Sequence, residues 1–208
     1  MPANHALVVG ACNVDVKGRS DGMLLSHTSN PGSVEVSAGG VGRNVAENLA
    51  RLGQPTILLS AVGGDAYGQF LLEATRQAGV DTSRVLQAPE MRSCCFVALM
   101  NHRGDLEAAV ADMGALQKVT VDYLATHEDL VRGASFLVLD ADIPEESLLW
   151  CLEAAGRYGV PVCVEPISGA RARGLVPHLG RITMVTPNRE EAEVLVGYPL
   201  VTADDIAR

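Results

Sequence analysis

Residues 38–53, AGGVGRNVAENLARLG, place a glycine-rich turn directly before an amphipathic helix. Gly39 and Gly40 allow the backbone to approach a ligand closely, at a helix N-terminus where free N–H groups point outward. Asn44 lies one turn inside this N-terminus, and Gly53 is placed to end the helix. Four side chains recur at helical spacing and predict one apolar stripe, widened by two alanines: Val41, Val45, Leu49 and Leu52, with Ala46 and Ala50.

The same stretch does not match the two common glycine-rich phosphate-binding motifs. Val45 stands where the third glycine of the dinucleotide fingerprint GxGxxG belongs, and no buried strand precedes the turn. The sequence GxxxxGK(S/T) does not occur in the chain, which excludes a P-loop. A ligand at this turn is therefore expected to bind by neither of these two motifs. Because Val45 replaces the third glycine, an NAD-binding domain is disfavoured.

The composition suits one large domain, or a domain with a small appendage, and we treat residues 1–208 as a single domain. A net charge of −9 disfavours a nucleic-acid or anionic-membrane partner, because either would need a basic face. The sequence has no N-terminal signal pattern and no apolar run near the ~20 residues of a membrane span, which predicts a cytoplasmic protein with a small-molecule partner. Its five cysteines form no CxxC pair and are expected to be reduced.

Strand and helix patterns alternate along most of the chain, which favours an α/β fold with a mainly parallel sheet covered on both faces. Apolar runs predict strands over residues 6–11, 56–62, 135–139, 160–164 and 182–186. Amphipathic patterns predict further helices over residues 69–78, 145–158, 170–179 and 188–196. Two segments, at about 16–37 and 91–112, carry turn signals between short exposed strands and predict a small β lid.

The last residues predict that the C-terminal part of the domain is missing. Thr202 starts a helix and Asp205 takes the capping-box position, yet the sequence stops at Arg208, inside the second turn. So short a helix is rarely the end of a domain, because the cost of nucleation is offset only by further length or packing. We therefore expect an N-terminal portion of a longer domain.

Asn13 and Asp15 follow the first predicted strand, where open α/β sheets keep their ligand sites. An amide and a carboxylate together can donate to and accept from vicinal hydroxyls, which suits a sugar. An Asx turn after a strand explains the same two residues equally well. Gly39, Gly40 and Asn44 could complete the sugar site, or they could form a helix cap with a surface asparagine.

Oxygen donors also gather near the ends of later strands. Residues 186–193, TPNREEAE, begin a helix in which Asn188 is the N-cap and Glu191 reaches back, and this interpretation is favoured locally. The functional alternative is that both residues organise Mg2+ and its water shell beside nucleotide phosphates. Four more carboxylates lie at or near predicted strand ends, and their shared edge favours a site: Asp112, Asp140, Asp142 and Glu165.

Together these features resemble the PfkB, or ribokinase-like, carbohydrate kinase family along essentially the whole chain. Residues 38–46, with Gly53 and Gly64 downstream, look like the family's N-terminal signature, and residues 186–191 look like its NxxE motif. Within the family the chain is most similar to the pseudouridine kinases. That narrower similarity rests on NVDV at 13–16, SNPG at 29–32, GRN at 42–44, SAVG at 60–63 and ADM at 111–113.

The resemblance implies a three-layer α/β/α sandwich carrying a small β lid, with the substrate bound between them. The residues that it places on the ribosyl hydroxyls are Asn13, Asp15, Gly39, Gly40 and Asn44. It aligns Asp142 with a polar position that contacts the sugar. The lid residues that it turns toward the base are Ser93, Phe96 and Asp112.

The resemblance also implies ATP and Mg2+ as cofactors, and it leaves a need for a monovalent cation such as K+ open. Asn188 and Glu191 would order Mg2+ and the ATP phosphates. Glu165 would be a second metal-binding carboxylate, near a position that is often aspartate in relatives. A homodimer through the lid is a further expectation.

The family's GAGD motif, which supplies an anion hole and the general base, has no counterpart in this sequence, so no catalytic residue is assigned. By the same resemblance Asp65, after Gly63 and Gly64, is a structural turn residue. The leading hypothesis is ATP-dependent phosphorylation of a ribosyl-type substrate, from pseudouridine to pseudouridine 5′-phosphate. The alternatives are a ribokinase or another sugar or nucleoside kinase of the family, and a catalytically silent ligand-binding protein.

Overall fold

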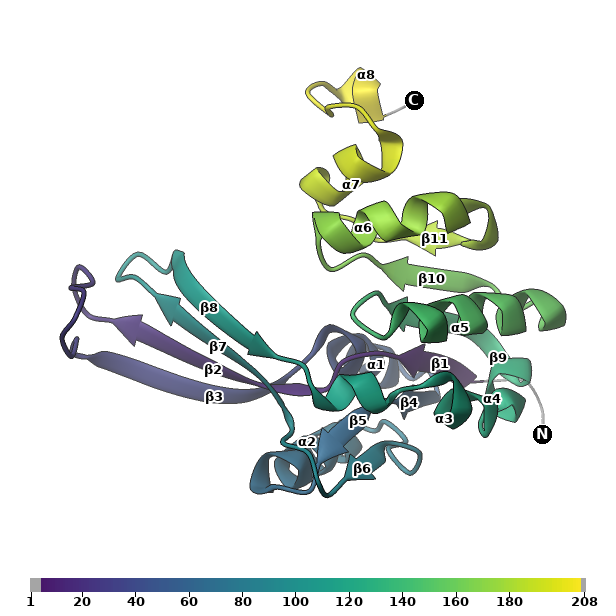
Figure 1. Cartoon of the computed structure of the whole chain (residues 1–208), viewed down its shortest axis with the longest axis horizontal. Coiled ribbons are helices and arrows are strands. Elements are labelled where there is room, and N and C mark those ends of the chain that lie inside the picture. Colours follow the sequence, from purple (N-terminus) through teal and green to yellow (C-terminus); the bar gives the residue numbers. More distant parts are fainter. Residues whose placement is uncertain (1–4, 207–208) are drawn as a thin grey trace.

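The computed structural model describes residues 5–206 and has two parts, a body built on a parallel sheet and a second sheet that projects from it (Figure 1). The strand order in the body is β11-β10-β9-β1-β4, and every neighbouring pair is parallel. These strands are β1 (His5–Val9), β4 (Thr56–Leu59), β9 (Ala134–Asp140), β10 (Val162–Glu165) and β11 (Met184–Val185). The predicted, mainly parallel sheet is confirmed.

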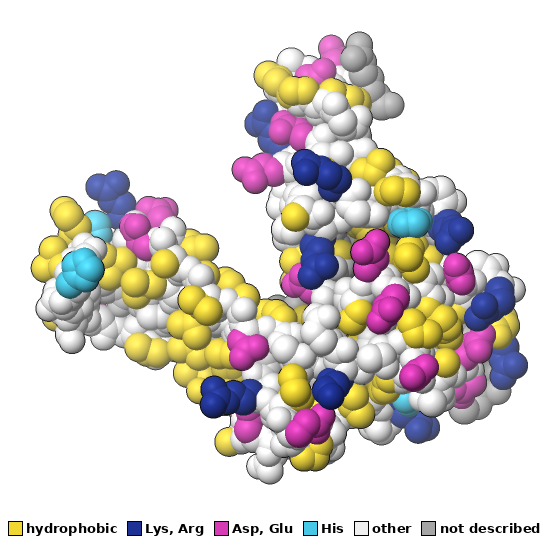
Figure 2. Space-filling view, viewed as in Figure 1, with side chains coloured by type: hydrophobic (Ala, Val, Ile, Leu, Met, Phe, Trp, Pro, Cys, Tyr) yellow, Lys and Arg dark blue, Asp and Glu magenta, His cyan; other side chains and the backbone are white. Residues whose placement is uncertain are grey.

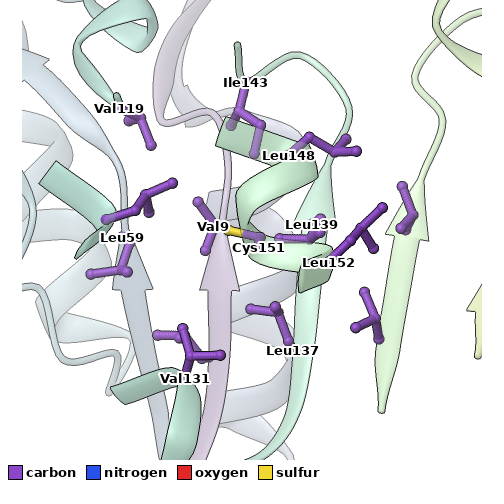
Figure 3. Close-up of a cluster of buried hydrophobic side chains, with 14 of the residues drawn as sticks. Val9, Leu59, Val119, Val131, Leu137, Leu139, Ile143, Leu148, Cys151 and Leu152 are labelled. Atoms are coloured by element: carbon purple, nitrogen blue, oxygen red, sulfur yellow. The ribbon is translucent and has the colours of Figure 1, made fainter. Parts of the chain in front are cut away.

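Helices cover both faces of this sheet, because successive strand residues point to opposite sides. Leu7 and Val9 of β1 belong to one buried cluster and Val8 belongs to another. The first cluster, part of which is drawn in Figure 3, packs against α3 (Val121–Ala125), α4 (Glu128–Arg132), α5 (Glu145–Tyr158) and α6 (Gly169–Leu175). The second packs against α1 (Val41–Arg51) and α2 (Ala66–Gln77). The result is the three-layer sandwich that the sequence predicts.

Two segments differ from the predicted elements. The strand predicted over 56–62 is interrupted at Ser60, because β5 (Ala61–Gly63) leaves the main sheet and pairs with β6 (Leu86–Ala88). Residues 115–132 form short helical turns that the sequence did not indicate, namely η1 (Ala115–Lys118), α3 and α4. The chain continues after α6 through η2 (Val176–Arg181), α7 (Arg189–Val196) and α8 (Ala203–Ile206).

Of the apolar stripe predicted for α1, only the middle residues, Val45 and Leu49, are partly buried. Leu52 is 83% exposed and Val41 is 36% exposed, so neither end of the predicted stripe is buried. Gly42 and Ala46 face the sheet instead, since a Cβ on Gly42 would lie 2.7 Å from the Cα of Gly10. Small residues, and not large apolar ones, therefore let the start of α1 approach β1. Gly53 has a φ of 85° and ends the helix as predicted.

The projecting sheet, which we call the lid sheet, has the strand order β3-β2-β7-β8. Its strands are β2 (Asn13–Ser20), β3 (Gly32–Gly39), β7 (Cys94–Met100) and β8 (Leu106–Asp112). Val36, Val16, Val97 and Val110 stand opposite one another across the four strands, so they share one face. Asp15, Phe96 and Ala111 likewise share the other face. Figure 2 shows hydrophobic side chains spread along this sheet.

No helix within residues 5–206 combines the length and the apolar character that crossing a membrane requires.

Candidate functional site

A cavity of about 460 Å³ lies where the lid sheet meets the carboxyl ends of β1 and β9. Six of the predicted substrate residues line it: Asn13, Asp15, Gly40, Asn44, Phe96 and Asp142. The cavity is also lined by residues to which the sequence analysis gave no binding role, among them Met113, Gln117, Ile167 and Arg171. The structure therefore brings together residues from the lid, from α1 and from three strand ends.

Asn13 and Asp15 begin the first lid strand, directly after β1 and the turn that follows it. Nδ2 of Asn13 donates to Oδ1 of Asp15 at 2.7 Å, and Nζ of Lys17 lies 3.7 Å from the other carboxylate oxygen. Gly39 does not line the cavity but determines its shape, because a Cβ there would lie 2.6 Å from the Asp15 carboxyl carbon. A glycine at position 39 thus leaves the space that the Asp15 carboxylate occupies.

The glycine-rich turn brings the start of α1 against the end of β1. Gly40 has a φ of 98°, a backbone conformation that residues with a side chain rarely adopt. A Cβ at this position would also lie 2.4 Å from the carbonyl oxygen of Ala11. That carbonyl accepts a hydrogen bond from the backbone N–H of Arg43 at 2.9 Å. Asn44 follows on the exposed side of the helix, where it lines the cavity.

Asp140, the last residue of β9, lines the cavity and is only 1% exposed, although the resemblance assigned it no role. Its Oδ2 accepts from the backbone N–H of Ala11 at 2.9 Å and of Gly42 at 3.2 Å, and its Oδ1 accepts from Asp142 at 2.9 Å. Burial raises the pKa of the Asp140 carboxyl above its ordinary value, and these three N–H groups oppose the rise. The sequence placed this carboxylate at the shared edge but could not show its partners.

Asp142 and Arg171 form an ion pair at the edge of the cavity, with 3.3 Å between Oδ1 and Nε. Arg171 lies on α6, and the turn before this helix is strained. Ile167 has a φ of 69°, and the N–H of Ser168 donates to the carbonyl of Pro166 at 2.8 Å across it. A β-branched residue in this conformation costs about 1–3 kcal/mol, and such residues are concentrated at ligand sites.

Two predicted lid residues lie outside the cavity lining. Ser93 is buried, and its hydroxyl donates to Oδ1 of Asp65 at 2.6 Å and accepts from the N–H of Gly63 at 3.0 Å. Asp112 is exposed at the end of β8 and accepts from the N–H of Gly114 at 3.1 Å. The structure therefore does not bring either side chain to the cavity.

Asp65 is a structural residue, as the sequence indicated. Its carboxylate caps α2 by accepting from the N–H of Gly68 at 2.9 Å. Although burial raises its pKa, hydrogen bonds from Ser93 and Gly68 outweigh that effect and hold the pKa below its ordinary value. The pair of Asp65 and Ser93 ties the start of β7 to the start of α2.

Asn188 and Glu191 form the capping box that the local sequence favoured. Oδ1 of Asn188 accepts from the N–H of Glu191 at 2.9 Å, and the Glu191 carboxylate accepts from the backbone N–H and Nδ2 of Asn188 at 3.0 and 2.8 Å. Glu165 ends the neighbouring strand β10 and accepts a hydrogen bond from the hydroxyl of Thr186. These residues lie apart from the lining of the cavity.

The three residues Glu165, Asn188 and Glu191 offer only oxygen ligands, which is the donor chemistry that Mg2+ requires. Within residues 5–206, no three His, Cys, Asp or Glu side chains lie close enough to form a metal cage. Mg2+ usually keeps several of its waters and is held by only one or two carboxylates. Glu165 and Glu191 fit this kind of site better than a cage in which protein atoms supply every ligand.

A family profile described as "pfkB family carbohydrate kinase" matches residues 3–208. Pseudouridine kinase of Escherichia coli K12 is 39% identical over 205 residues, which cover 99% of this chain and 65% of that protein. The uncharacterized sugar kinase YeiI of the same strain is 34% identical, over 97% of this chain and 55% of its own length. The chain thus spans about two thirds or less of these relatives.

Solved structures have the same fold. A carbohydrate kinase from Agrobacterium tumefaciens superposes with a TM-score of 0.83 and 34% identity, covering 93% of this chain and 64% of that protein. A ribokinase of Arabidopsis thaliana, solved in complex with ribose and ATP, superposes with a TM-score of 0.80 over 99% of this chain and 66% of its own, at 24% identity. The ribokinase-like fold with a β lid is therefore confirmed.

Proposed function

The chain belongs to the pfkB family of carbohydrate kinases, and we propose that its cavity binds a ribosyl substrate for ATP-dependent transfer of phosphate to the 5′-hydroxyl. The observation that carries this proposal is the convergence of Asn13, Asp15, Asn44 and Asp142 on one cavity beneath the lid sheet. Carboxylates accept hydrogen bonds and amides donate them, so together they match vicinal hydroxyls.

Pseudouridine is the substrate that we propose. The 39% identity with the pseudouridine kinase of E. coli supports this choice, compared with 28% for a guanosine-inosine kinase and 26% for a ribokinase of Staphylococcus aureus. Phe96 and Met113 give the cavity an apolar side, which suits the flat face of a base. Gly39 supports the position of Asp15, while Ser93 and Asp112 remain outside the contacts that we assign.

ATP is the proposed phosphate donor, since the Arabidopsis ribokinase with the same fold was solved with ribose and ATP. Asn188, Glu191 and Glu165 are the residues that would hold Mg2+, which on binding neutralises charge on the phosphates. The residues of this chain bind and orient the sugar, so that its hydroxyl is held for in-line attack. We assign no general base within residues 1–208.

A homodimer through the lid sheet is the proposed assembly. Val34, Val36, Val97, Leu99 and Val110 are exposed, and the strand register places them on the lid face opposite Asp15. An exposed apolar face of this kind is a common interaction surface, because covering it removes apolar area from water. A second copy of the chain would supply a matching apolar face.

Isothermal titration calorimetry of the chain against pseudouridine, uridine, ribose and adenosine tests the substrate. The expected result is that pseudouridine binds more tightly than the other three ligands. If ribose bound and pseudouridine did not, pseudouridine would be excluded as the substrate, while a sugar kinase would remain the proposed function.

Phosphoryl transfer from ATP in the presence of Mg2+, followed by detection of pseudouridine 5′-phosphate, distinguishes a kinase from a silent ligand-binding protein. Binding of pseudouridine with no product would favour the silent alternative for this 208-residue chain.

A further inference from the structure

Arg43 is a buried cation behind the substrate cavity, and it touches the side chain of Asn44. It lies on α1 and is only 7% exposed. Its Nη1 donates to Oδ1 of Asn44 at 3.0 Å and to the carbonyl of Ala38, in β3, at 3.2 Å. Its Nε donates to Oγ1 of Thr75, in α2, at 3.3 Å. One guanidinium thus connects the glycine-rich turn, the lid and α2 with the asparagine of the cavity.

From these contacts we infer that Arg43 is a positioning residue, which fixes the amide of Asn44 so that its N–H donors face the substrate. The inference rests on the proposed function, because it assigns the way in which a ribosyl hydroxyl is recognised. Asn44 has one acceptor oxygen and one donor nitrogen on its amide. Because Oδ1 of Asn44 accepts a hydrogen bond from Arg43, Nδ2 of Asn44 is left to donate into the cavity. If the amide were reversed, Nδ2 would face the Nη1 donor of Arg43, and two donors would be in contact.

A donor at this position complements the rest of the cavity. Asp15, Asp140 and Asp142 carry carboxylates, which when ionised only accept hydrogen bonds. The amide nitrogen of Asn13 already donates to Asp15. A hydroxyl that donates its proton to a carboxylate still has an oxygen that needs a donor, and Asn44 supplies one. An Asn44 amide in the other orientation would add a further acceptor instead.

The guanidinium is itself held in place, which makes it a suitable anchor. Glu47, one turn along α1, pairs with Nη2 of Arg43, and the same carboxylate pairs with Arg51 at 2.6 Å. The hydroxyl of Thr75 donates to the carbonyl of Leu71 at 2.6 Å, so its oxygen accepts from Arg43. A buried charge is tolerated when it is paired and fully hydrogen-bonded, and the planar fork of arginine can serve several acceptors at once.

The first test observes the Asn44 side-chain amide directly by NMR in the ligand-free protein, with its signal assigned from its absence in Asn44→Ala. Arg43→Met removes all the donors, and Arg43→Lys keeps the charge beside Glu47 but loses the fork. Arg51→Met is the matched control, because Arg51 shares Glu47 but is exposed. We expect the amide signal to move in both Arg43 variants and to stay in the control. An unmoved signal in a folded Arg43 variant would overturn the inference.

The second test measures pseudouridine affinity by calorimetry in two backgrounds. Arg43→Lys is expected to weaken binding about tenfold in the native background, and by less than about twofold when Asn44→Ala is already present. Equal losses in both backgrounds would mean that Arg43 acts on the fold and not through Asn44. If the native protein bound none of pseudouridine, uridine and ribose, the proposed function would fail, and the amide signal alone would decide the role of Arg43.

Discussion

Asp140 and Asp142 are separated by one residue, yet their carboxylates meet different surroundings. Asp140 is buried under the junction of β1 and α1, where three backbone N–H groups bind it. Asp142 remains partly exposed and pairs with Arg171 at the cavity edge. Asp140 therefore supports the shape of the site, while Asp142, although paired with Arg171, is accessible from the cavity.

Replacing Asp140 with asparagine is expected to destabilise the fold by about 1–3 kcal/mol, because a side-chain N–H would then face a backbone N–H. The effect should depend on pH. The pKa of Asp140 is raised in the folded state from an ordinary 3.8, so between these two values the folded protein binds more protons than the unfolded chain. Stability from this group is then complete at acid pH and declines as pH rises through the raised pKa.

The measurement is urea unfolding of the native protein and of Asp140→Asn over a pH series from about 4 to 8. The native protein should exceed Asp140→Asn in free energy of unfolding by more at acid pH than at pH 8. The reason is that the contribution of Asp140 declines as pH rises, while asparagine does not titrate. A difference that stayed constant or grew toward pH 8 would contradict the assigned direction of the pKa shift.

Asn44→Ala is expected to weaken pseudouridine binding about tenfold through loss of one hydrogen bond to the ligand, and to leave a folded protein that is less stable by about 1–3 kcal/mol, because a buried N–H of Arg43 loses its acceptor. Asn48→Ala is the control, because Asn48 is exposed one turn further along α1 and does not line the cavity. Calorimetry and a thermal melt of both variants check this prediction. Unfolding of Asn44→Ala would show that the residue is chiefly structural.

At the scale of elements, the contact between β1 and α1 depends on two glycines that face each other. Gly10 and Gly42 leave no room for a side chain, since a Cβ on Gly42 would lie 2.7 Å from the Cα of Gly10. The same contact brings Gly42 to the Asp140 carboxylate and places Gly40 and Asn44 at the cavity. The site therefore forms only when the first turn of α1 packs against β1.

Gly42→Ala is expected to destabilise the protein by about 1–3 kcal/mol, because α1 must move away from β1. Gly156→Ala in α5 is the matched control, with no atom within 4 Å of the added Cβ, and it should stabilise by about 0.5–1 kcal/mol. Urea unfolding of both variants gives the two values. A neutral or stabilising Gly42→Ala would contradict the close contact.

At the scale of the whole molecule, the lid sheet projects from the body and leaves one apolar face uncovered (Figures 1 and 2). Close to the body, Val14 and Val16 of β2 pack into the second buried cluster. Farther along the lid, Val34 and Val110 are exposed. The apolar face thus continues from the core to the surface, where a second copy is the proposed cover.

Val110→Lys is expected to shift the protein from a dimer to a monomer, because a charge would be buried in the proposed contact. Leu52→Lys is the control, since Leu52 is equally apolar and exposed but lies at the end of α1. Light scattering during size-exclusion chromatography measures both masses. A native protein that is monomeric at high concentration would exclude the lid contact.

The family and most of the helices and strands could be predicted from the sequence. The predicted helix over 145–158 coincides with α5, the glycine-rich turn precedes α1, and the predicted caps at Asn188 and Gly53 are present. These features depend on interactions within a few residues, namely side-chain periodicity, capping hydrogen bonds and glycine conformation. Local sequence specifies them wherever the segment lies in the fold.

The set of polar residues that share the cavity depends on how distant segments pack, and the sequence did not predict it in full. The tertiary structure separated Ser93 and Asp112 from the lining, and added Arg171 and Gln117 to it. It also broke the strand predicted over 56–62 at Ser60. The physical reason is that burial and hydrogen-bond partners come from distant segments: Asp140 and Ala11, 129 residues apart in the sequence, meet at 2.9 Å.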